Sequence, residues 1–371
     1  MVNALRRLDK KFLILAGLVV CLPILIIIFL AIIRGCGDSK VSPQKYEEKM
    51  ISALEKYSKE KNKVPSEEGE LLTVKLSTLV SGGYIKSPEN ALGDSTCEGS
   101  VSVRRNAASV ESTNGGFLNY TVNLECKDYS TVHLVDKLKE DIVTSDSGLY
   151  KEEDSYIFKG NKPNNHITFF GHNYRIMSID KDGILKLVKE QPEGTNRIWD
   201  NKYNIETNRS SGINIYKDSM IKEYLLNDYL NTKKISTKAK KQIVAHDACV
   251  GKRNSNNFAI DSSLDCSEKL EKQLVSLISI SDYAKASLDQ NCTNLRSFSC
   301  NNYNYLYGVV SSTWTLNSTL DNSYESLYLA DGLMETQNAN TYSEYNLVIY
   351  ISGDVLYTTG NGTSNNPYVI Q

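Results

Sequence analysis

The sequence predicts an α+β protein in three parts: a single N-terminal transmembrane helix, a small helix-plus-antiparallel-sheet domain, and a larger mixed α+β domain. Three observations lead to this fold class: a long apolar run near the N-terminus, helical spacing of apolar residues after it, and strand-like alternation beyond that. In the 371-residue chain we expect a cytoplasmic N-terminus at 1–11, a transmembrane anchor at 12–34, and extracellular domains at 43–142 and 143–371.

The apolar run at 12–33 carries no charge, and a bilayer core requires roughly 20 helical residues. Arg34 and Lys40 follow it closely. More basic residues precede it, namely Arg6, Arg7, Lys10 and Lys11. This asymmetry favours a single-pass protein of the cell membrane with its N-terminus inside and its C-terminal domains outside. The alternative is a cleaved signal peptide, whose apolar region would be shorter, about 7 to 15 residues.

The first extracellular domain is expected to begin with helices. Tyr46, Met50, Leu54 and Tyr57 recur at helical spacing and would form one core-facing stripe. The segment 71–85, "LLTVKLSTLVSGGYI", is predicted as a short helix that ends at its glycine pair.

An antiparallel hairpin should follow these helices. In "CEGSVSV" the residues Cys97, Val101 and Val103 share one face, and in "LNYTVNLEC" Val122 and Cys126 share another. Placing Val101 opposite Val122 also places Cys97 opposite Cys126, at a separation that suits a cross-strand disulfide.

Cysteine usage supports an oxidising compartment. Six cysteines lie in the expected exterior and form three local couples: Cys97 with Cys126, Cys249 with Cys266, and Cys292 with Cys300. We predict a disulfide in each couple, although six cysteines permit fifteen pairings in principle.

The second domain is expected to combine strands with short helices. Strands around Tyr174 and Leu185 would be joined by a turn at 180–183. A helix over 217–230 would be capped by Asp218 or Ser219, and a capped turn is expected at Asp282. Further strands are predicted at 311–319 and within 345–370.

Five segments in order, "YIFKGNKPNNHITF", "YRIMSID", "LISISDYAKA", "WTL" and "SGDVLYTTGNGTSNNPYVI", resemble an uncharacterised extracellular domain of low-GC Gram-positive bacteria. The resemblance covers about 147–371 and implies a C-type-lectin-like or sulfatase-modifying-factor-like α+β fold. The chain departs from that pattern at Tyr174, where Trp is usual, and at Asn346-Leu347, where Arg-Pro is usual.

The N-terminal order of elements is similar to that of type IV pilin-like and pseudopilin-like proteins, over about 12–135. The sequence has no Gly-Phe processing site and no acidic residue within 12–33, so a polymerising pilin is not expected.

The chain ends in a polar turn followed by a last apolar strand. Asn361-Gly362 favours a tight turn, which would return Tyr368-Val369-Ile370 to the sheet. The alternative is that Asn361, Thr363 and Asn365 contact a glycan or an ion.

Catalytic chemistry is scarce. His166 and His172 lie on a probable strand pair, and His246 lies near Cys249, but neither group has a third convergent ligand or orienting partner. A Cys249 nucleophile activated by His246 is an alternative to its disulfide. We expect no catalytic residues, no metal and no cofactor.

The composition directs the functional prediction toward binding. A net charge of −2 gives no case for nucleic acid. Tyr303, Tyr305 and Tyr307 alternate, so they would either contact a ligand or cover one face of a half-buried strand. We therefore expect a membrane-anchored bacterial cell-surface binding protein with a non-catalytic recognition domain for a glycan, a wall polymer or a surface protein. The alternatives are a structural or assembly component of a pilus-like or secretion apparatus and, third, an exported enzyme.

Overall fold

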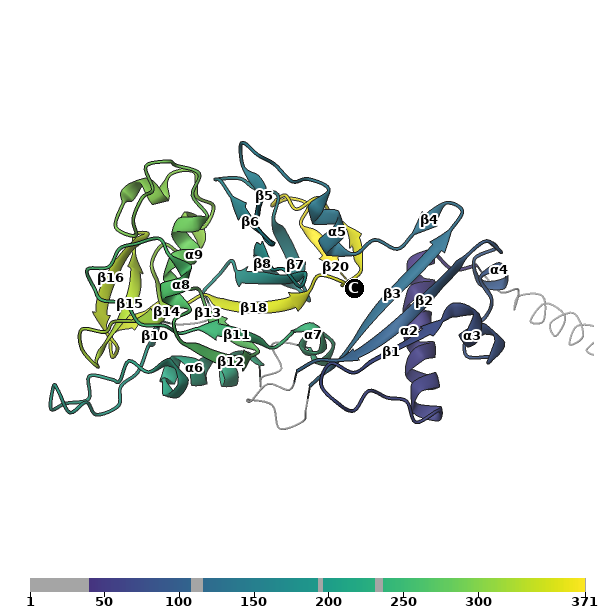
Figure 1. Ribbon diagram of the computed structural model, residues 1–371, viewed down its shortest axis with the longest axis horizontal. Helices are drawn as coiled ribbons and strands as arrows, with labels where there is room; N and C mark the ends of the chain where they lie inside the picture. The colour runs from purple at the N-terminus through teal and green to yellow at the C-terminus, as the bar shows by residue number, and fades with distance from the viewer. Residues whose placement is uncertain (1–39, 108–115, 193–195, 231–235, 371) are drawn as a thin grey trace, which may run out of the picture.

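A computed structural model of the chain describes residues 40–107, 116–192, 196–230 and 236–370 (Figure 1). The expected cytoplasmic segment 1–11 and the expected anchor at 12–34 lie outside these residues. Within the described ranges, no helix is both long enough and apolar enough to cross a membrane.

The predicted α+β class is wrong, because the protein is mostly β-sheet, with 35% of residues in strands and 22% in helices. The helix α2 (Pro43–Glu60) is long, but the helices of the second domain are short pieces between strands. The segment predicted as one helix at 71–85 is in fact a strand, β1 (Leu71–Lys75), followed by α3 (Leu76–Ser81). Pairing of β1 with a neighbouring strand overrides its helical pattern.

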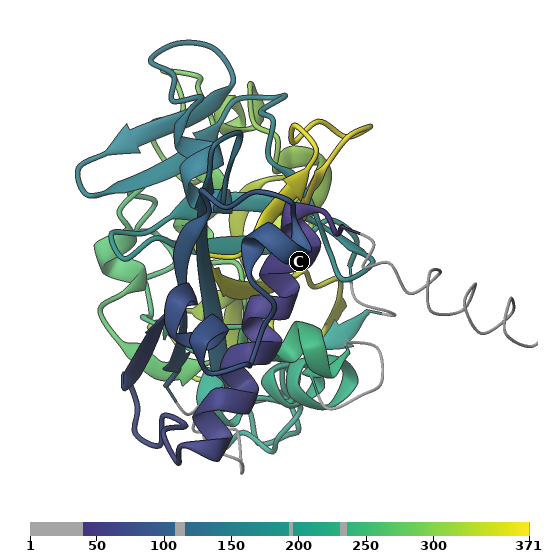
Figure 2. The same ribbon diagram turned by 90° about the vertical axis from the view of Figure 1, so that its right-hand side faces the viewer.

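The first domain is a four-stranded antiparallel sheet in the order β1-β2-β3-β4, with α2 packed across one face (Figure 2). Its remaining elements are α4 (Pro88–Ala91), β2 (Glu98–Arg105), β3 (Leu118–Cys126) and β4 (Tyr129–Ser130). Tyr46, Met50 and Leu54 are fully buried, as the helical stripe predicts. The predicted hairpin register is confirmed, since Val101 faces Val122 and Val103 faces Tyr120.

The second domain is built on a nine-stranded sheet. Its strands are β5 (Gly148–Glu152), β6 (Ser155–Lys159), β7 (His166–Phe169), β8 (His172–Ile179), β9 (Ile184–Lys189), β13 (Val275–Leu277), β18 (Leu347–Ser352), β19 (Tyr357–Thr359) and β20 (Tyr368–Ile370). The order runs β13-β18-β9-β8-β7-β20-β19, and β6 also pairs with β8 while β5 pairs with β6. The predicted turn at 180–183 joins β8 to β9, where the Asp180 carboxylate accepts hydrogen bonds from the backbone of Asp182 and Ile184.

Smaller sheets and short helices surround this sheet. The sheets are β10 (Arg197–Ile198) with β17 (Tyr342–Ser343), β11 (His246–Cys249) with β12 (Lys269–Gln273), and β14 (Thr313–Ser318), β15 (Glu325–Ala330) and β16 (Leu333–Asn338). The helices are α5 (Leu134–Lys139), η1 (Tyr216–Asp218), α6 (Met220–Tyr224), η2 (Leu225–Leu230), α7 (Thr237–Gln242), α8 (Ser262–Asp265), α9 (Ile280–Lys285), η3 (Phe298–Asn301) and α10 (Tyr307–Val310). Of the two predicted caps near 218, Ser219 is the one that caps α6.

The interior strand β8 pairs with β9 along one side and is shared by two partners, β7 and β6, along the other, where the sheet forks. Its first half pairs with β7 and its last residues pair with β6. Asn165 fills the fork: its backbone oxygen accepts from Ile176 N, and its side-chain amide donates to Ile176 O at 2.7 Å. At the fork, β5 and β6 continue the sheet from the end of β8, while β7 pairs with its beginning.

Backbone hydrogen bonds and one buried leucine hold the two domains together. Leu134 N and Val135 N donate to the carbonyls of Val355 and Gly353, and Leu356 is buried in the hydrophobic core of the first domain. The helix α5 packs with the second core, so the cores divide between Tyr129 and Leu134, before the expected boundary at 143.

Candidate functional site

The three tyrosines singled out by their alternation do not lie on a strand. Tyr303 and Tyr307 are exposed, whereas Tyr305 is buried. The buried side chain of Asn304 organises this segment as a turn, because its amide donates to the carbonyls of Tyr283 and Cys300. The interpretation of a half-buried strand is therefore wrong.

The polar residues of the C-terminal turn are used within the turn. The Asn361 side-chain oxygen accepts from Thr363 Oγ1 at 2.8 Å, and the Asn361 backbone N–H donates to Asn366 O at 3.0 Å. Asn365 is exposed. As predicted, β20 returns to the sheet, where it pairs with β7.

Each of the three predicted disulfides is present in the structure. Bonds join Cys97 to Cys126, Cys249 to Cys266, and Cys292 to Cys300. An oxidised Cys249 cannot act as a nucleophile, so the alternative that paired it with His246 is not supported. Among the described residues, one group has the composition of a metal site, Asp94 with Cys97 and Cys126, but its two sulfurs are bonded to each other.

A pocket of about 360 Å³, lined by both polar and apolar side chains, lies on one face of the large sheet, beside the fork. Strands β6, β8, β9 and β18 form its floor, and α8, α9 and β11 form its walls. Its ionisable and aromatic lining residues are Glu152, Tyr156, Asp180, Lys186, His246, Asp282, Lys285, Tyr305 and Tyr350. Ionisable groups with shifted pKa values gather here, which is typical of functional sites.

Lys186 and Asp282 form an ion pair at the floor of this pocket. Lys186 Nζ donates to Asp282 Oδ2 at 2.5 Å, and both side chains are largely buried. Burial alone would raise the pKa of the Asp282 carboxyl, but the Lys186 charge and the hydrogen bonds from Lys186 and Ser279 outweigh it and lower that pKa. Burial opposes the charge of Lys186 too, and Asp282 more than compensates, which raises the pKa of the ammonium. Both groups are therefore charged at neutral pH.

His246 and Tyr350 form a second polar group at the wall of the pocket. Their rings are stacked, with centroids 4.0 Å apart and planes at 9°. His246 Nδ1 donates to the carbonyl of Asp247, and Nε2 lies 3.3 Å from Asp180 Oδ2. Burial raises the pKa of the Asp180 carboxyl, but hydrogen bonds from His246 and the backbone outweigh it, so the net pKa is lowered. Burial also raises the pKa of the Tyr350 phenol.

Arg175 supports the pocket from beneath. Its guanidinium carbon lies 4.8 Å from the centroid of the Tyr305 ring, and its Nε donates to Asn165 Oδ1 at 2.7 Å. Burial lowers the pKa of Arg175, against the raising effect of Tyr305 and Glu190. Tyr305, which was predicted either to contact a ligand or to cover a strand face, is thus a buried residue that lines the pocket.

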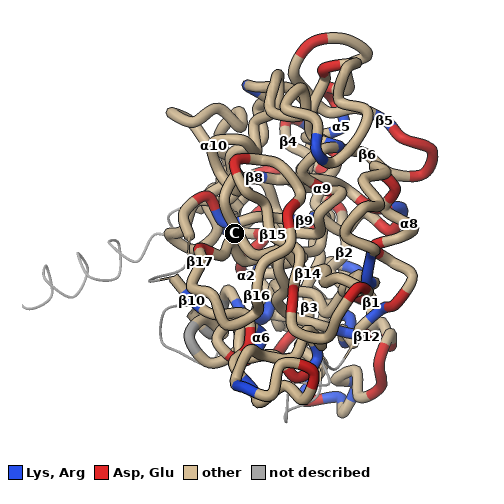
Figure 3. Tube along the Cα trace, turned by 90° about the vertical axis from the view of Figure 1, so that its left-hand side faces the viewer, with Lys and Arg blue, Asp and Glu red and all other residues tan. Residues whose placement is uncertain are grey.

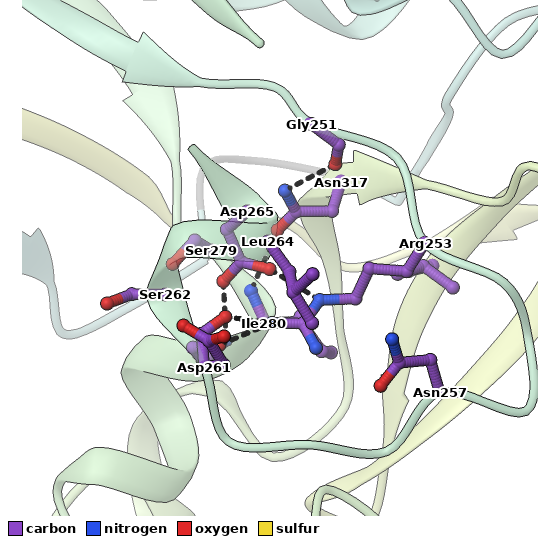
Figure 4. A network of polar contacts seen from close by, with 12 residues as sticks. Gly251, Arg253, Asn257, Asp261, Ser262, Leu264, Asp265, Ser279, Ile280 and Asn317 are labelled. Atoms are coloured by element: carbon purple, nitrogen blue, oxygen red, sulfur yellow. Dashed lines mark hydrogen bonds and ion pairs between the residues drawn. The ribbon is translucent and has the colours of Figure 1, made fainter. Parts of the chain in front are cut away.

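A buried polar network fixes the start of α9 and with it Asp282 (Figure 4). Arg253 donates to Asp265 at 2.6 Å and to Ser281 Oγ at 2.7 Å, and Asp265 accepts from Ser281 N. Asn317 Oδ1 accepts from Ile280 N at 3.0 Å. Arg253, Asp265 and Asn317 are all buried, so this network holds the helix that carries Asp282 in one position.

The lining residues can hold a ligand through hydrogen bonds and aromatic contacts. Lys285 Nζ donates to Ser262 Oγ at 2.7 Å, and Lys186 is paired with Asp282. The pocket therefore offers hydrogen-bonding groups that neighbouring side chains hold in place, together with aromatic rings.

Most of this site was not predicted from the sequence as a site. Asp180 and Asp282 were identified only as turn and cap residues, and Lys186 and Tyr350 were not singled out. Lys186 had one available signal, since it interrupts the apolar strand "ILKLVK" on the face opposite Leu185 and Leu187. His166 and His172 lie at opposite ends of the β7–β8 hairpin and do not converge.

Comparisons of the chain with protein-family models, with curated proteins and with solved structures found no match. The resemblances to a Gram-positive extracellular domain and to pilin-like proteins stay predictions.

Proposed function

We propose that this chain is a bacterial cell-surface binding protein whose second domain recognises a saccharide unit of a glycan or wall polymer outside the cell. Attachment to the membrane through 12–34 is part of this proposal. The observation that carries it is the pocket, in which Lys186 and Asp282 are paired, Lys285 donates to Ser262, and the lining includes aromatic rings.

The Lys186–Asp282 ion pair and the Lys285–Ser262 hydrogen bond support an uncharged, hydroxyl-rich ligand. A charged ligand would be recognised by an opposite charge held ready for it, whereas Lys186 and Asp282 already neutralise each other. Sugar hydroxyls can both donate and accept hydrogen bonds, and the faces of Tyr156 and Tyr350 suit the apolar face of a sugar ring. A volume of about 360 Å³ is near the low end for small-ligand pockets, which run from roughly 300 to 1,000 Å³, so it fits a short saccharide.

The three disulfides support an oxidising location, because such bonds persist outside the cytoplasm.

A binding screen of the full chain in nanodiscs against defined glycans and purified wall polymers tests the proposal. For a polymer that binds, Tyr156→Ala should weaken the affinity by about tenfold, a change of about 1.4 kcal/mol. The matched control is Tyr303→Ala, which removes an exposed tyrosine that does not line the pocket and should leave the affinity unchanged. If Tyr303→Ala abolishes binding while Tyr156→Ala does not, the pocket is not the binding site.

A further inference from the structure

We propose that two copies of this chain associate through an apolar patch at the end of the second domain, on the opposite side of the molecule from the first domain. The patch, called here the tip patch, comprises Tyr203, Ile205, Ile215 and Leu320. These residues lie on loops 201–215 and 319–324, which occupy the left end in Figure 1, far from α2 and α4.

The four side chains of the tip patch are unusually exposed for large apolar residues. Ile205 is 87% exposed, Tyr203 and Leu320 are each 58% exposed, and Ile215 is 47% exposed. Hydrogen bonds between the two loops place these side chains near one another: Asn214 Nδ2 donates to Thr319 O at 3.0 Å, and Ser323 N donates to Glu206 Oε2 at 3.1 Å. Exposed apolar residues scattered singly are ordinary, but a group on joined loops marks an interaction surface.

The loops are held rigidly by buried polar side chains. Asp200 accepts hydrogen bonds from the backbone of Lys202, Ile213 and Met220. Asn204 donates to Gly212 O at 2.8 Å and to Ser323 Oγ at 2.9 Å. Asp200, Asn204 and Asn214 are almost fully buried. The interior of these loops is thus polar, while the four apolar side chains of the tip patch lie on an exterior that also carries polar and charged residues. A fixed exterior lowers the entropic cost of binding.

The charged residues around the tip patch indicate which kind of partner it binds. Its exposed flanking charges are three cations, Lys202, Arg209 and Lys217, and three acids, Glu206, Asp218 and Asp321. Figure 3, which faces this end, shows both signs interspersed. An anionic bilayer would require an excess of basic residues, and a glycan would not use exposed aliphatic side chains. The tip patch would therefore fit a protein surface that is itself apolar and carries charges of both signs. A second copy of the chain, related by a two-fold axis, offers such a surface, because the cations of one copy can face the acids of the other.

Cysteine cross-linking of the full chain in its membrane tests this association. The background carries Cys21→Ser and Cys36→Ser, because these two cysteines lie outside the three disulfides. In that background Ile205→Cys should form a disulfide-linked dimer on mild oxidation. The matched control is Lys151→Cys, at another exposed position, on β5, which should not form a dimer. Adding Leu320→Glu to Ile205→Cys should abolish the dimer, because a carboxylate would then be buried in an apolar contact.

Three outcomes overturn the proposal: no dimer from Ile205→Cys, an equal yield from Lys151→Cys, or a yield that Leu320→Glu does not reduce. Because Ile205 is exposed, its replacement leaves the fold intact, so a missing dimer cannot be attributed to misfolding. Cross-linking of Ile205→Cys only to another protein would also count against a second copy as the partner. None of these results depends on saccharide binding.

Discussion

At the scale of the residue, the Lys186–Asp282 pair is the part of the pocket where we expect a single substitution to destabilise the protein most. Lys186→Met removes the ammonium but leaves the Asp282 carboxylate buried without its partner. Breaking a buried pair in this way should cost about 3 kcal/mol in the free energy of unfolding. Denaturant unfolding measures this cost. The double variant Lys186→Met with Asp282→Asn should lose less than the sum of the single variants, and full additivity would show that the two residues do not interact.

The same pair predicts a pH dependence of stability. The pKa of Asp282 is lowered on folding, so its contribution is present above its unfolded pKa of about 3.9 and is lost as the pH falls through the lower folded value. The pKa of Lys186 is raised, so its contribution is present below about 10.4 and is lost as the pH rises further. Stability should therefore fall more steeply below pH 4 and above pH 10 in the wild type than in the double variant. Equal pH profiles, measured by thermal unfolding, would contradict this.

At the scale of the element, the disulfide Cys97–Cys126 staples the ends of β2 and β3 over a sequence separation of 29 residues. Replacing both cysteines with alanine should lower the free energy of unfolding by about 3 kcal/mol if the bond acts mainly on the unfolded chain. The same change at Cys292–Cys300, with a separation of 8 residues, should cost about 1 kcal/mol less. The comparison uses urea unfolding, and a larger loss for the shorter loop would argue against the chain-entropy explanation.

Local patterns predicted the elements whose neighbours are close in sequence. The β2–β3 register followed from alternation around Val101 and Val122, and the cap of α9 followed from Asp282. Patterns failed where a distant contact decides the structure. The first part of the segment 71–85, which has a helical pattern, forms a strand because β1 pairs with β2. The alternating tyrosines lie in a turn instead of a strand because of the hydrogen bonds of Asn304. The pocket was missed for the same reason, because Lys186 and Asp282 meet only when β9 packs against α9.

At the scale of the whole molecule, Leu356 couples the two domains, since it comes from the second domain and is buried in the core of the first. Leu356→Ala should remove about 2 to 3 kcal/mol from this contact. We expect the variant to unfold in two calorimetric transitions where the wild type unfolds in one. Leu71→Ala, at a half-exposed leucine of the first domain, is the control and should keep a single transition.

The topology proposed for the chain is tested on intact protoplasts. External protease should degrade everything after about residue 40, because the charge asymmetry around 12–33 places both domains outside. The cytoplasmic segment 1–11, carrying an added epitope, should survive. Protection of the second domain would contradict an outside location.

The pairing of β20 with β7 has a consequence for biogenesis. β20 holds the last described residues of the chain, yet it lies inside the sheet order, between β7 and β19. Such a non-local contact slows folding, because most of the domain must be available before the contact can form. If the chain is exported, the edge of β7 stays unpaired until β20 has cleared the secretion channel, which keeps the polypeptide open to chaperones and proteases until then. A chain cut before β20 would leave that edge unpaired, so the β20–β7 pair forms only after every other described strand has been exported.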